Sequence, residues 1–168
     1  MTAVRRVPLE ALTREAFAPF GDLIAADDAA GRPINSGTTM RFDWTTLPQG
    51  DRPGARPNLA VFRSRPQALP LRVTLLERHP HSTQLLVPIR VSRWVAVVAP
   101  DGPGDTPDTS GLRAFVVLAG QSVNLRKGVW HHPVTVLDEP AELLMLAWED
   151  GGAGDCETRL LEVPIEVG

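Results

Sequence analysis

Four histidines are the residues of this sequence best suited to proton transfer or metal binding, and they fall in two short segments. His79 and His81 lie in "ERHPHSTQ", and His131 and His132 lie in "GVWHHPVTV". An unperturbed imidazole has a pKa of about 6.5, so histidine can act as an acid or a base near neutral pH and can bind a metal ion when neutral. The clustering therefore raises the hypothesis of a catalytic or metal site.

Strand geometry predicts which of these side chains can meet. In an extended segment alternate side chains share a face, so Glu77 and His79 should point the same way, with Arg78 pointing away. Gln84 begins the next extended segment and could bring an amide to the same place. The adjacent pair, 131 and 132, should face opposite sides, so only one of them should join the first cluster. The alternative is that these histidines are buried and only hydrogen-bond to backbone carbonyls.

The elements that must position these residues are mostly β-strands. Sixteen prolines and fourteen glycines interrupt the sequence, and the segments between them are short and rich in Val, Leu and Ile. One short helix is expected at 14–20, capped by Thr13 and ended by Gly21. The expected strands are 22–25, 58–65, 71–79, 83–89, 93–99, 112–119, 121–128, 133–137, 142–149 and 158–165. This pattern predicts an all-β sandwich or barrel.

The stretch 100–111 consists almost entirely of turn-forming residues, and we expect an exposed loop there rather than a domain linker. Strands of one kind continue on both sides of it. A length of 168 residues also suits one core. We therefore expect a single domain spanning 1–168.

Composition argues against several classes of partner. The formal net charge is −3, and there is no run of basic residues of the kind that binds nucleic acid. The beginning of the chain has no apolar signal-peptide core, and no segment approaches the roughly 20 apolar residues needed to cross a bilayer. Cys156, the one cysteine, should be a reduced bystander. We expect a soluble, cytoplasmic protein that acts on a small molecule.

The spacing of the candidate residues resembles the two cupin motifs. The segment 77–84 resembles the first motif, which in metal-binding cupins carries two histidines and a glutamate, and the segment 120–131 resembles the second, which ends in a histidine. The resemblance implies a cupin-like antiparallel β-barrel of the jelly-roll type. It also implies a divalent metal ion, and mixed nitrogen and oxygen ligands suit Ni, Fe, Mn or Zn. The ligands carried over by position are Glu77, His79, Gln84 and His131.

A closer resemblance covers residues from about 5 to 165. The blocks "INSGTTMRF", "LPLRVTLLERHPHSTQLLVPI", "VVAPDGPGDTPDTSGLRAF" and "GQSVNLRKGVWHHPV" resemble the ureidoglycolate lyase family, small cupin-like enzymes of allantoin breakdown in purine metabolism. The resemblance implies cleavage of (S)-ureidoglycolate to glyoxylate and urea by a homodimeric protein. It makes nickel the expected metal.

The implied reaction assigns roles to several residues. A base must take the hydroxyl proton of the substrate and an acid must protonate the urea nitrogen, so the resemblance makes Glu77, His79 and His131 the catalytic candidates. The substrate carboxylate needs a cation, for which Arg126 and Lys127 are the candidates. The remaining substrate-binding candidates are Gln84, Asn124 and His132.

The sequence departs from the family pattern at two places. Family members commonly carry Tyr and His where this chain has Leu125 and Arg126, and an Asp-Arg pair where it has Glu149 and Asp150. The second change removes a cation that could bind the substrate carboxylate. The alternative function is therefore a cupin-like protein of the same family with a shifted pocket, which acts on or senses another small carboxylic acid. His81 adds a titratable group of undetermined role.

Overall fold

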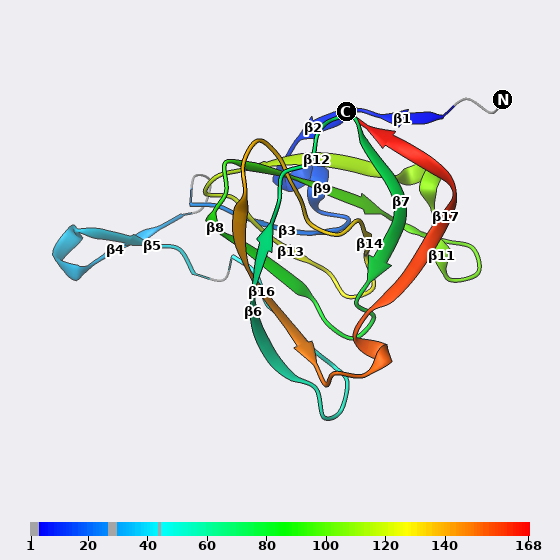
Figure 1. The fold of residues 1–168 in the computed structure, drawn as a ribbon. Helices are drawn as coiled ribbons and strands as arrows, with labels where there is room; N and C mark the ends of the chain where they lie inside the picture. Colours follow the sequence, from blue (N-terminus) through cyan, green and yellow to red (C-terminus); the bar gives the residue numbers. More distant parts are fainter. Residues whose placement is uncertain (1–3, 27–29, 44) are drawn as a thin grey trace.

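The protein folds into two β-sheets that face each other (Figure 1). The computed structural model describes residues 4–26, 30–43 and 45–168. The larger sheet has the strand order β1-β17-β7-β14-β9-β12-β2, with β15 paired to β9. Its strands are β1 (Arg5–Val7), β2 (Leu9–Ala11), β7 (Leu71–Arg78), β9 (Arg93–Ala99), β12 (Arg113–Leu118), β14 (Trp130–His131), β15 (Thr135–Val136) and β17 (Glu157–Val167).

The smaller sheet has the order β3-β13-β8-β16-β6. Its strands are β3 (Gly21–Ile24), β6 (Arg56–Ser64), β8 (Gln84–Arg90), β13 (Ser122–Leu125) and β16 (Ala141–Glu149). The pairs within it are antiparallel. The predicted all-β barrel architecture is confirmed, and each of the ten predicted strands has a counterpart.

The main hydrophobic core lies between the two sheets. Leu86 of β8 and Met145 of β16 come from the smaller sheet, and Val98 of β9 and Phe115 of β12 come from the larger one. Phe115 is completely buried and packs edge to face against Phe17, with ring centroids 5.5 Å apart. Burial of these apolar side chains is the main source of stability for such a pair of sheets.

The larger sheet buries its other face as well. The sheet curls because β1 and β2 follow each other in the chain but lie at its two opposite edges. At one edge β1 pairs with β17, and at the other β2 pairs with β12. A second core fills the curl with side chains such as Val73, Val95 and Val97. Both faces of β9 are therefore buried, which accounts for its uninterrupted apolar sequence.

Two local predictions need correction, and some short strands were not predicted. The helix α1 covers only Arg14–Phe17, although Thr13 caps it as predicted by accepting a hydrogen bond from the Ala16 N–H at 3.2 Å. Pro19 follows too closely for another turn. The 100–111 stretch contains a small hairpin of β10 (Asp101–Gly102) and β11 (Thr106–Pro107), followed by the 3₁₀ turn η2 (Thr109–Gly111). The short strands β1, β2 and β14 were not predicted.

A second small hairpin projects from the body of the protein, as the blue ribbon at the left of Figure 1 shows. It is made of β4 (Arg32–Ile34), the 3₁₀ turn η1 (Asn35–Gly37) and β5 (Thr39–Arg41), and it was also not predicted. The remaining 3₁₀ turn, η3 (Ala153–Asp155), lies between β16 and β17. In the described part of the chain no helix has the length and apolar character required to span a membrane.

The central position of Phe115 gives a testable prediction. Phe115→Ala should lower the free energy of unfolding by about 3–5 kcal/mol, because it removes apolar contacts and leaves a cavity between the sheets. Leu118→Ala at the exposed end of the same strand should change it by less than about 0.5 kcal/mol. Urea unfolding followed by tryptophan fluorescence measures both values. Equal losses in the two variants would contradict this description of the core.

Candidate active and metal site

Four of the predicted site residues meet at one end of the space between the sheets. Glu77 is near the end of β7, and His131 on β14 is its direct partner across the two strands. His79 follows the end of β7, and Gln84 is the first residue of β8. The prediction that Glu77, His79, Gln84 and His131 converge is thus fulfilled in the structure, because the turn after β7 brings the start of β8 back to the same place.

The distances within this group are short enough for shared chemistry. His131 Nε2 lies 3.6 Å from Glu77 Oε1. The imidazole rings of His79 and His131 are stacked, with centroids 5.3 Å apart and an angle of 28° between the ring planes. One potential ligand atom from each of Glu77, His79 and His131 lies within 4.8 Å of the other two.

Backbone carbonyls fix the proton position on both imidazoles. His79 Nδ1 lies 2.7 Å from the Asp155 carbonyl oxygen, and His131 Nδ1 lies 2.9 Å from the Val129 carbonyl oxygen. A carbonyl oxygen only accepts hydrogen bonds, so each Nδ1 carries the proton and donates it. The lone pair of each ring is therefore on Nε2, which is the arrangement found where histidine binds a metal ion.

The two Nε2 atoms have different surroundings. The side-chain N–H of Gln84 donates to His79 Nε2 at 2.9 Å. His131 Nε2 is buried and has no hydrogen-bond partner within the described residues. A buried acceptor without a partner is costly, so this atom is suited to receive a substrate proton or a metal ion. The chemistry and spacing of Glu77, His79 and His131 therefore fit a divalent cation.

Burial and neighbouring charges alter the acidity of the group. Burial opposes ionisation of Glu77, but the hydrogen bond and positive charge that His131 can provide outweigh it and lower the pKa of Glu77. Burial, reinforced by His131, lowers the pKa of His79 despite the opposing effect of the Asp155 carbonyl and of Glu77. Near neutral pH the site therefore holds a carboxylate beside an uncharged His79. These are the protonation states that a metal site requires.

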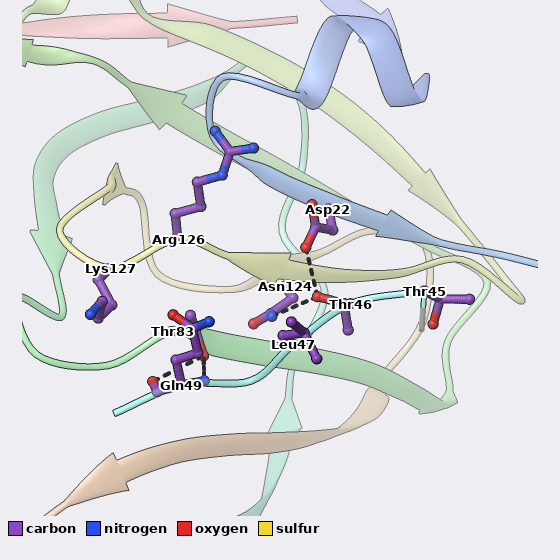
Figure 2. A pocket seen from close by; sticks show the side chains of 9 residues that line it. All are labelled: Asp22, Thr45, Thr46, Leu47, Gln49, Thr83, Asn124, Arg126 and Lys127. Atoms are coloured by element: carbon purple, nitrogen blue, oxygen red, sulfur yellow. Dashed lines mark hydrogen bonds between the residues drawn. The ribbon is translucent and has the colours of Figure 1, made fainter. Parts of the chain in front are cut away.

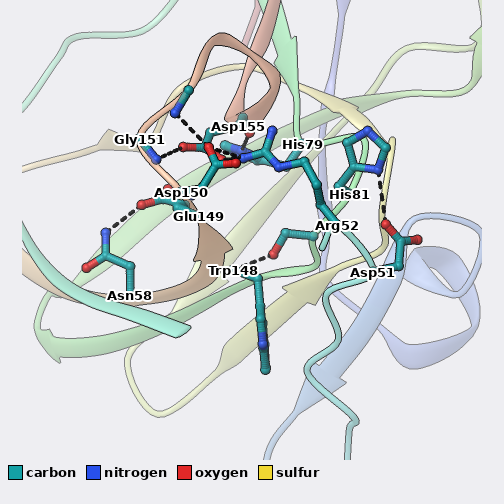
Figure 3. Close-up of polar contacts among 12 residues, drawn as sticks. Asp51, Arg52, Asn58, His79, His81, Trp148, Glu149, Asp150, Gly151 and Asp155 are labelled. Carbon is teal, nitrogen blue, oxygen red and sulfur yellow. Dashed lines mark hydrogen bonds and ion pairs between the residues drawn. The ribbon is translucent and has the colours of Figure 1, made fainter. Parts of the chain in front are cut away.

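A loop between β16 and β17 holds His79 in place (Figure 3). The Arg52 guanidinium forms ion pairs with Asp155 and, at 2.6 Å, with Asp150. The Asp155 carboxylate also accepts the backbone N–H of Gly151 at 2.7 Å. Because the carbonyl of this same Asp155 binds His79, the position of the imidazole depends on Arg52. Sequence reasoning missed Arg52 and Asp155, which are far apart in the chain and match no motif.

The three polar candidates of the segment 124–127 lie elsewhere. Val123 and Leu125 point into the core between the sheets, so Asn124 points to the outer face of the smaller sheet. Asn124, Arg126 and Lys127 line a separate pocket there (Figure 2). The residues that line this pocket do not include the four clustered residues. The structure therefore divides the predicted site residues between two places.

Arg78, His132 and His81 occupy three different environments. Arg78 points away from the cluster as predicted, with its guanidinium 4.5 Å from the centre of the Trp130 ring. His132 follows the end of β14 at His131, and both histidines border the same small void. His132 Nδ1 donates to the Pro133 carbonyl oxygen at 2.9 Å, and burial lowers the pKa of His132. His81 is half-exposed and pairs with Asp51 at 3.0 Å.

The positions that depart from the family pattern differ in how closely they approach the site. Leu125 borders the same void as His131, so an apolar group occupies this part of the interior. Glu149 continues the inward-facing series of β16, and its carboxylate accepts a hydrogen bond from the Asn58 side chain at 2.5 Å. Its negative charge acts on His79. Asp150 is exposed and is neutralised by Arg52.

Comparison with known proteins identifies the family. The model of the ureidoglycolate lyase family matches residues 4–168. The chain belongs to this family. It is 45% identical to the ureidoglycolate lyase of Burkholderia cepacia over 98% of this chain and 88% of that one. It is 38% identical to the ureidoglycolate lyase of Pseudomonas savastanoi pv. phaseolicola over 92% of this chain and 89% of that one.

Solved structures give weaker likenesses than these relatives of the ureidoglycolate lyase family. A dTDP sugar isomerase from Desulfovibrio desulfuricans has a TM-score of 0.49 at 18% identity, over 83% of this chain and 82% of that one. A 3,4-ketoisomerase from Helicobacter canadensis has a TM-score of 0.45 at 11% identity, over 80% of this chain and 87% of that one. The site assignment rests on neither of them.

The lowered histidine pKa values predict how stability depends on pH. In the unfolded chain His79 and His132 bind protons below about pH 6.5, whereas in the folded protein they do so only at lower pH. The unfolded state then holds more protons, so the free energy of unfolding should fall as the pH drops below about 6.5. The slope should be up to about 1.4 kcal/mol per pH unit for each histidine.

Urea unfolding of the metal-free protein between about pH 8 and pH 5.5 measures this slope. The window lies above the range in which ordinary carboxyl groups titrate. His79→Gln should reduce the slope, and His81→Gln, which changes a half-exposed histidine, serves as the matched control. A slope that is unaffected by His79→Gln would show that His79 is not held neutral by burial.

Proposed function

We propose that this protein is a lyase that cleaves ureidoglycolate to glyoxylate and urea, with Glu77, His79 and His131 at its reaction centre. The observation that carries the proposal is the family match over nearly the whole chain, together with the convergence of these three side chains. The finer points remain proposals from the sequence: the (S) enantiomer, a role in allantoin breakdown, and a cytoplasmic location.

The reaction needs one proton to move from oxygen to nitrogen. Ureidoglycolate loses its hydroxyl proton, the C–O bond becomes the carbonyl of glyoxylate, the C–N bond breaks, and the urea nitrogen gains the proton. His131 Nε2, which is buried with a free lone pair, is the proposed acceptor of this proton. Glu77, at 3.6 Å, stabilises the imidazolium that forms. The same proton then passes to the departing nitrogen, so atoms and charge balance.

His79 and Gln84 are proposed to orient the substrate. His79 is uncharged near neutral pH, and Gln84 contacts its Nε2, so the pair presents polar groups without adding a competing charge. The Gln84 amide has a donor and an acceptor for the ureido group. His132, which borders the interior void, is proposed to shape the wall beside His131.

We propose that a divalent metal ion, with nickel as the candidate from family resemblance, binds at this site. Glu77, His79 and His131 would hold it, and Gln84 is the candidate for a fourth ligand. A bound ion would take the Nε2 lone pair of His131, so the ion would replace His131 as the group that promotes loss of the hydroxyl proton. The positive charge of such an ion lowers the pKa of a hydroxyl group. The support is the ligand spacing and the Nδ1 hydrogen bonds, which place the lone pairs of both rings on Nε2.

Activity of single variants tests the proposal. His131→Ala and His79→Ala should lower kcat/KM for ureidoglycolate by about 100-fold or more, because a positioned acid or base contributes about 10²–10⁴-fold. His81→Ala is the control and should retain activity, since this side chain pairs with Asp51 outside the cluster. A coupled assay of glyoxylate release above the spontaneous rate measures these values. Full activity in the His79 and His131 variants would refute the site.

The same assay tests whether the lyase activity requires a metal ion. A chelator should abolish activity, nickel should restore it, and metal analysis should find the ion in the wild type but not in Glu77→Ala. Activity unaffected by chelation in a metal-free protein would remove the metal and leave the histidine mechanism. Absence of glyoxylate under all of these conditions would refute the lyase proposal.

One observation supports a second candidate function. Leu125 places an apolar side chain beside His131, where the family commonly carries a tyrosine. A pocket altered in this way could act on a different small carboxylic acid. Testing other hydroxy and ureido acids in parallel with ureidoglycolate decides between the two functions, since a preferred alternative substrate would favour the shifted pocket.

We also propose that the protein forms a homodimer through the outer face of the smaller sheet. Apolar side chains of three adjacent strands lie together on this face. They are Leu59 and Val61 of β6, Leu85, Val87 and Ile89 of β8, and Leu144 and Leu146 of β16. Leu59 is 64% exposed and Val61 58% exposed. An apolar patch of this extent is typical of a protein interface, and a flat sheet face can pair with a copy of itself.

The oligomeric state tests this interface. The wild type should sediment as a dimer, and Val61→Glu should shift it toward monomer because a charge would be buried between the subunits. Leu160→Glu, at an 80% exposed leucine of β17, is the matched control and should remain dimeric. Analytical ultracentrifugation gives the answer. A monomeric wild type, or a Val61→Glu variant that remains dimeric, would contradict the proposed interface.

A further inference from the structure

The pocket on the outer face of the smaller sheet has the properties of a binding site in its own right. It has a volume of about 600 Å³ and lies over β3, β13 and the start of β8, with the segment 45–49 as one wall (Figure 2). Its lining includes both acidic and basic side chains. The side chains that line it are Asp22, Thr45, Thr46, Leu47, Gln49, Thr83, Asn124, Arg126 and Lys127.

Hydrogen bonds hold the wall of this outer pocket in a defined position. Asn124 Nδ2 donates to Thr46 Oγ1 at 2.8 Å, and the Thr46 hydroxyl in turn donates to Asp22 Oδ2 at 2.7 Å. The backbone N–H of Gln49 donates to Thr83 Oγ1 at 2.9 Å, and the Thr83 N–H donates to the Gln49 carbonyl at 2.9 Å. The pocket is therefore ordered before any ligand enters, which lowers the cost of binding.

Asn124 supplies an unused acceptor at the base of the outer pocket. The residue is only 2% exposed, and its Oδ1 has no hydrogen-bond partner among the described residues. Figure 2 shows the amide oxygen on the side away from Thr46. A buried amide oxygen without a donor is unfavourable, so a ligand that provides an N–H there gains affinity by satisfying it.

Arg126 supplies an unused cation at the edge of the same pocket. Within the described ranges its guanidinium forms no hydrogen bond and no ion pair, while the neighbouring Lys127 is neutralised by Asp51 at 2.6 Å. A free guanidinium binds a carboxylate through two parallel hydrogen bonds. The outer pocket thus offers one site for a carboxylate and one for an uncharged N–H donor.

We propose that the outer pocket is a second binding site, separate from the histidine cluster, for a small ureido acid. Arg126 binds its carboxylate and Asn124 Oδ1 accepts a ureido N–H. The choice of a ureido group rests on the proposed function, because ureidoglycolate and its chemical neighbours carry both groups. The pocket contains none of the catalytic candidates, so a ligand bound there is held without being cleaved.

The test uses hydantoate, a ureido acid that lacks the hydroxyl group and is not cleaved by the proposed reaction. Titration calorimetry measures its affinity for the wild type and for variants of the full chain. Arg126→Gln should weaken binding by about 10-fold or more, as expected for the loss of a charged hydrogen bond. Arg72→Gln on β7, an exposed arginine outside the pocket, removes the same charge and should leave the affinity unchanged.

Two further measurements locate the ligand. In His79→Ala, hydantoate should still bind with the affinity of the wild type. In an NMR titration with hydantoate, the side-chain amide resonance of Asn124 should shift. Acetate, which has the carboxylate but no N–H donor, should bind at least 10-fold more weakly, and glycine tests whether an ammonium group can replace the ureido group.

Several outcomes would overturn this inference. They are the absence of hydantoate binding, equal affinity in the wild type and Arg126→Gln, and binding that disappears in His79→Ala with shifts confined to His79 and His131. Glycine binding more tightly than hydantoate would refute the ureido assignment. None of these results depends on glyoxylate release, so the inference and the proposed lyase activity can fail independently.

Discussion

The site depends on two hydrogen bonds from imidazole nitrogens to backbone carbonyls. His79 donates to Asp155 and His131 donates to Val129, and these bonds leave both Nε2 atoms as acceptors beside Glu77. If either ring were turned over, a proton would point into the cluster, and neither a metal ion nor a substrate proton could be accepted there. The β16–β17 loop and the Arg52 ion pairs hold the Asp155 carbonyl in place, and a turn in which the Val129 N–H donates to the Arg126 carbonyl positions that of Val129.

Strand alternation gives the smaller sheet two different polar regions. Residues such as Gln84 face the interior, where the histidines lie, whereas Asn124 on the neighbouring strand faces outward into the pocket bordered by Arg126. The outer face also carries the apolar patch of β6, β8 and β16. One sheet therefore supports a proposed reaction centre on one side and a proposed ligand site beside a proposed subunit interface on the other.

Sequence reasoning succeeded where local periodicity controls structure. Alternation placed Glu77 and His79 together, and the motif spacing brought in Gln84 and His131. It failed for Arg52 and Asp155, because their contact joins two loops that no periodic pattern relates. It also failed to separate Asn124 from the cluster, since the face taken by a four-residue strand is decided by the packing of Val123 and Leu125. Strands as short as β1 and β2 give no detectable periodicity.

The pairing of β1 with β17 determines when the larger sheet can close. Arg5–Val7 of β1 run parallel to Ile165–Val167 of β17, and the Gly168 N–H donates to the Val7 carbonyl at 3.0 Å. During synthesis this edge cannot form until β17 has left the ribosome, so the second core stays incomplete until then. Contacts between residues so far apart in sequence form slowly. Substitutions in β1 or β17 therefore act on a late step of folding.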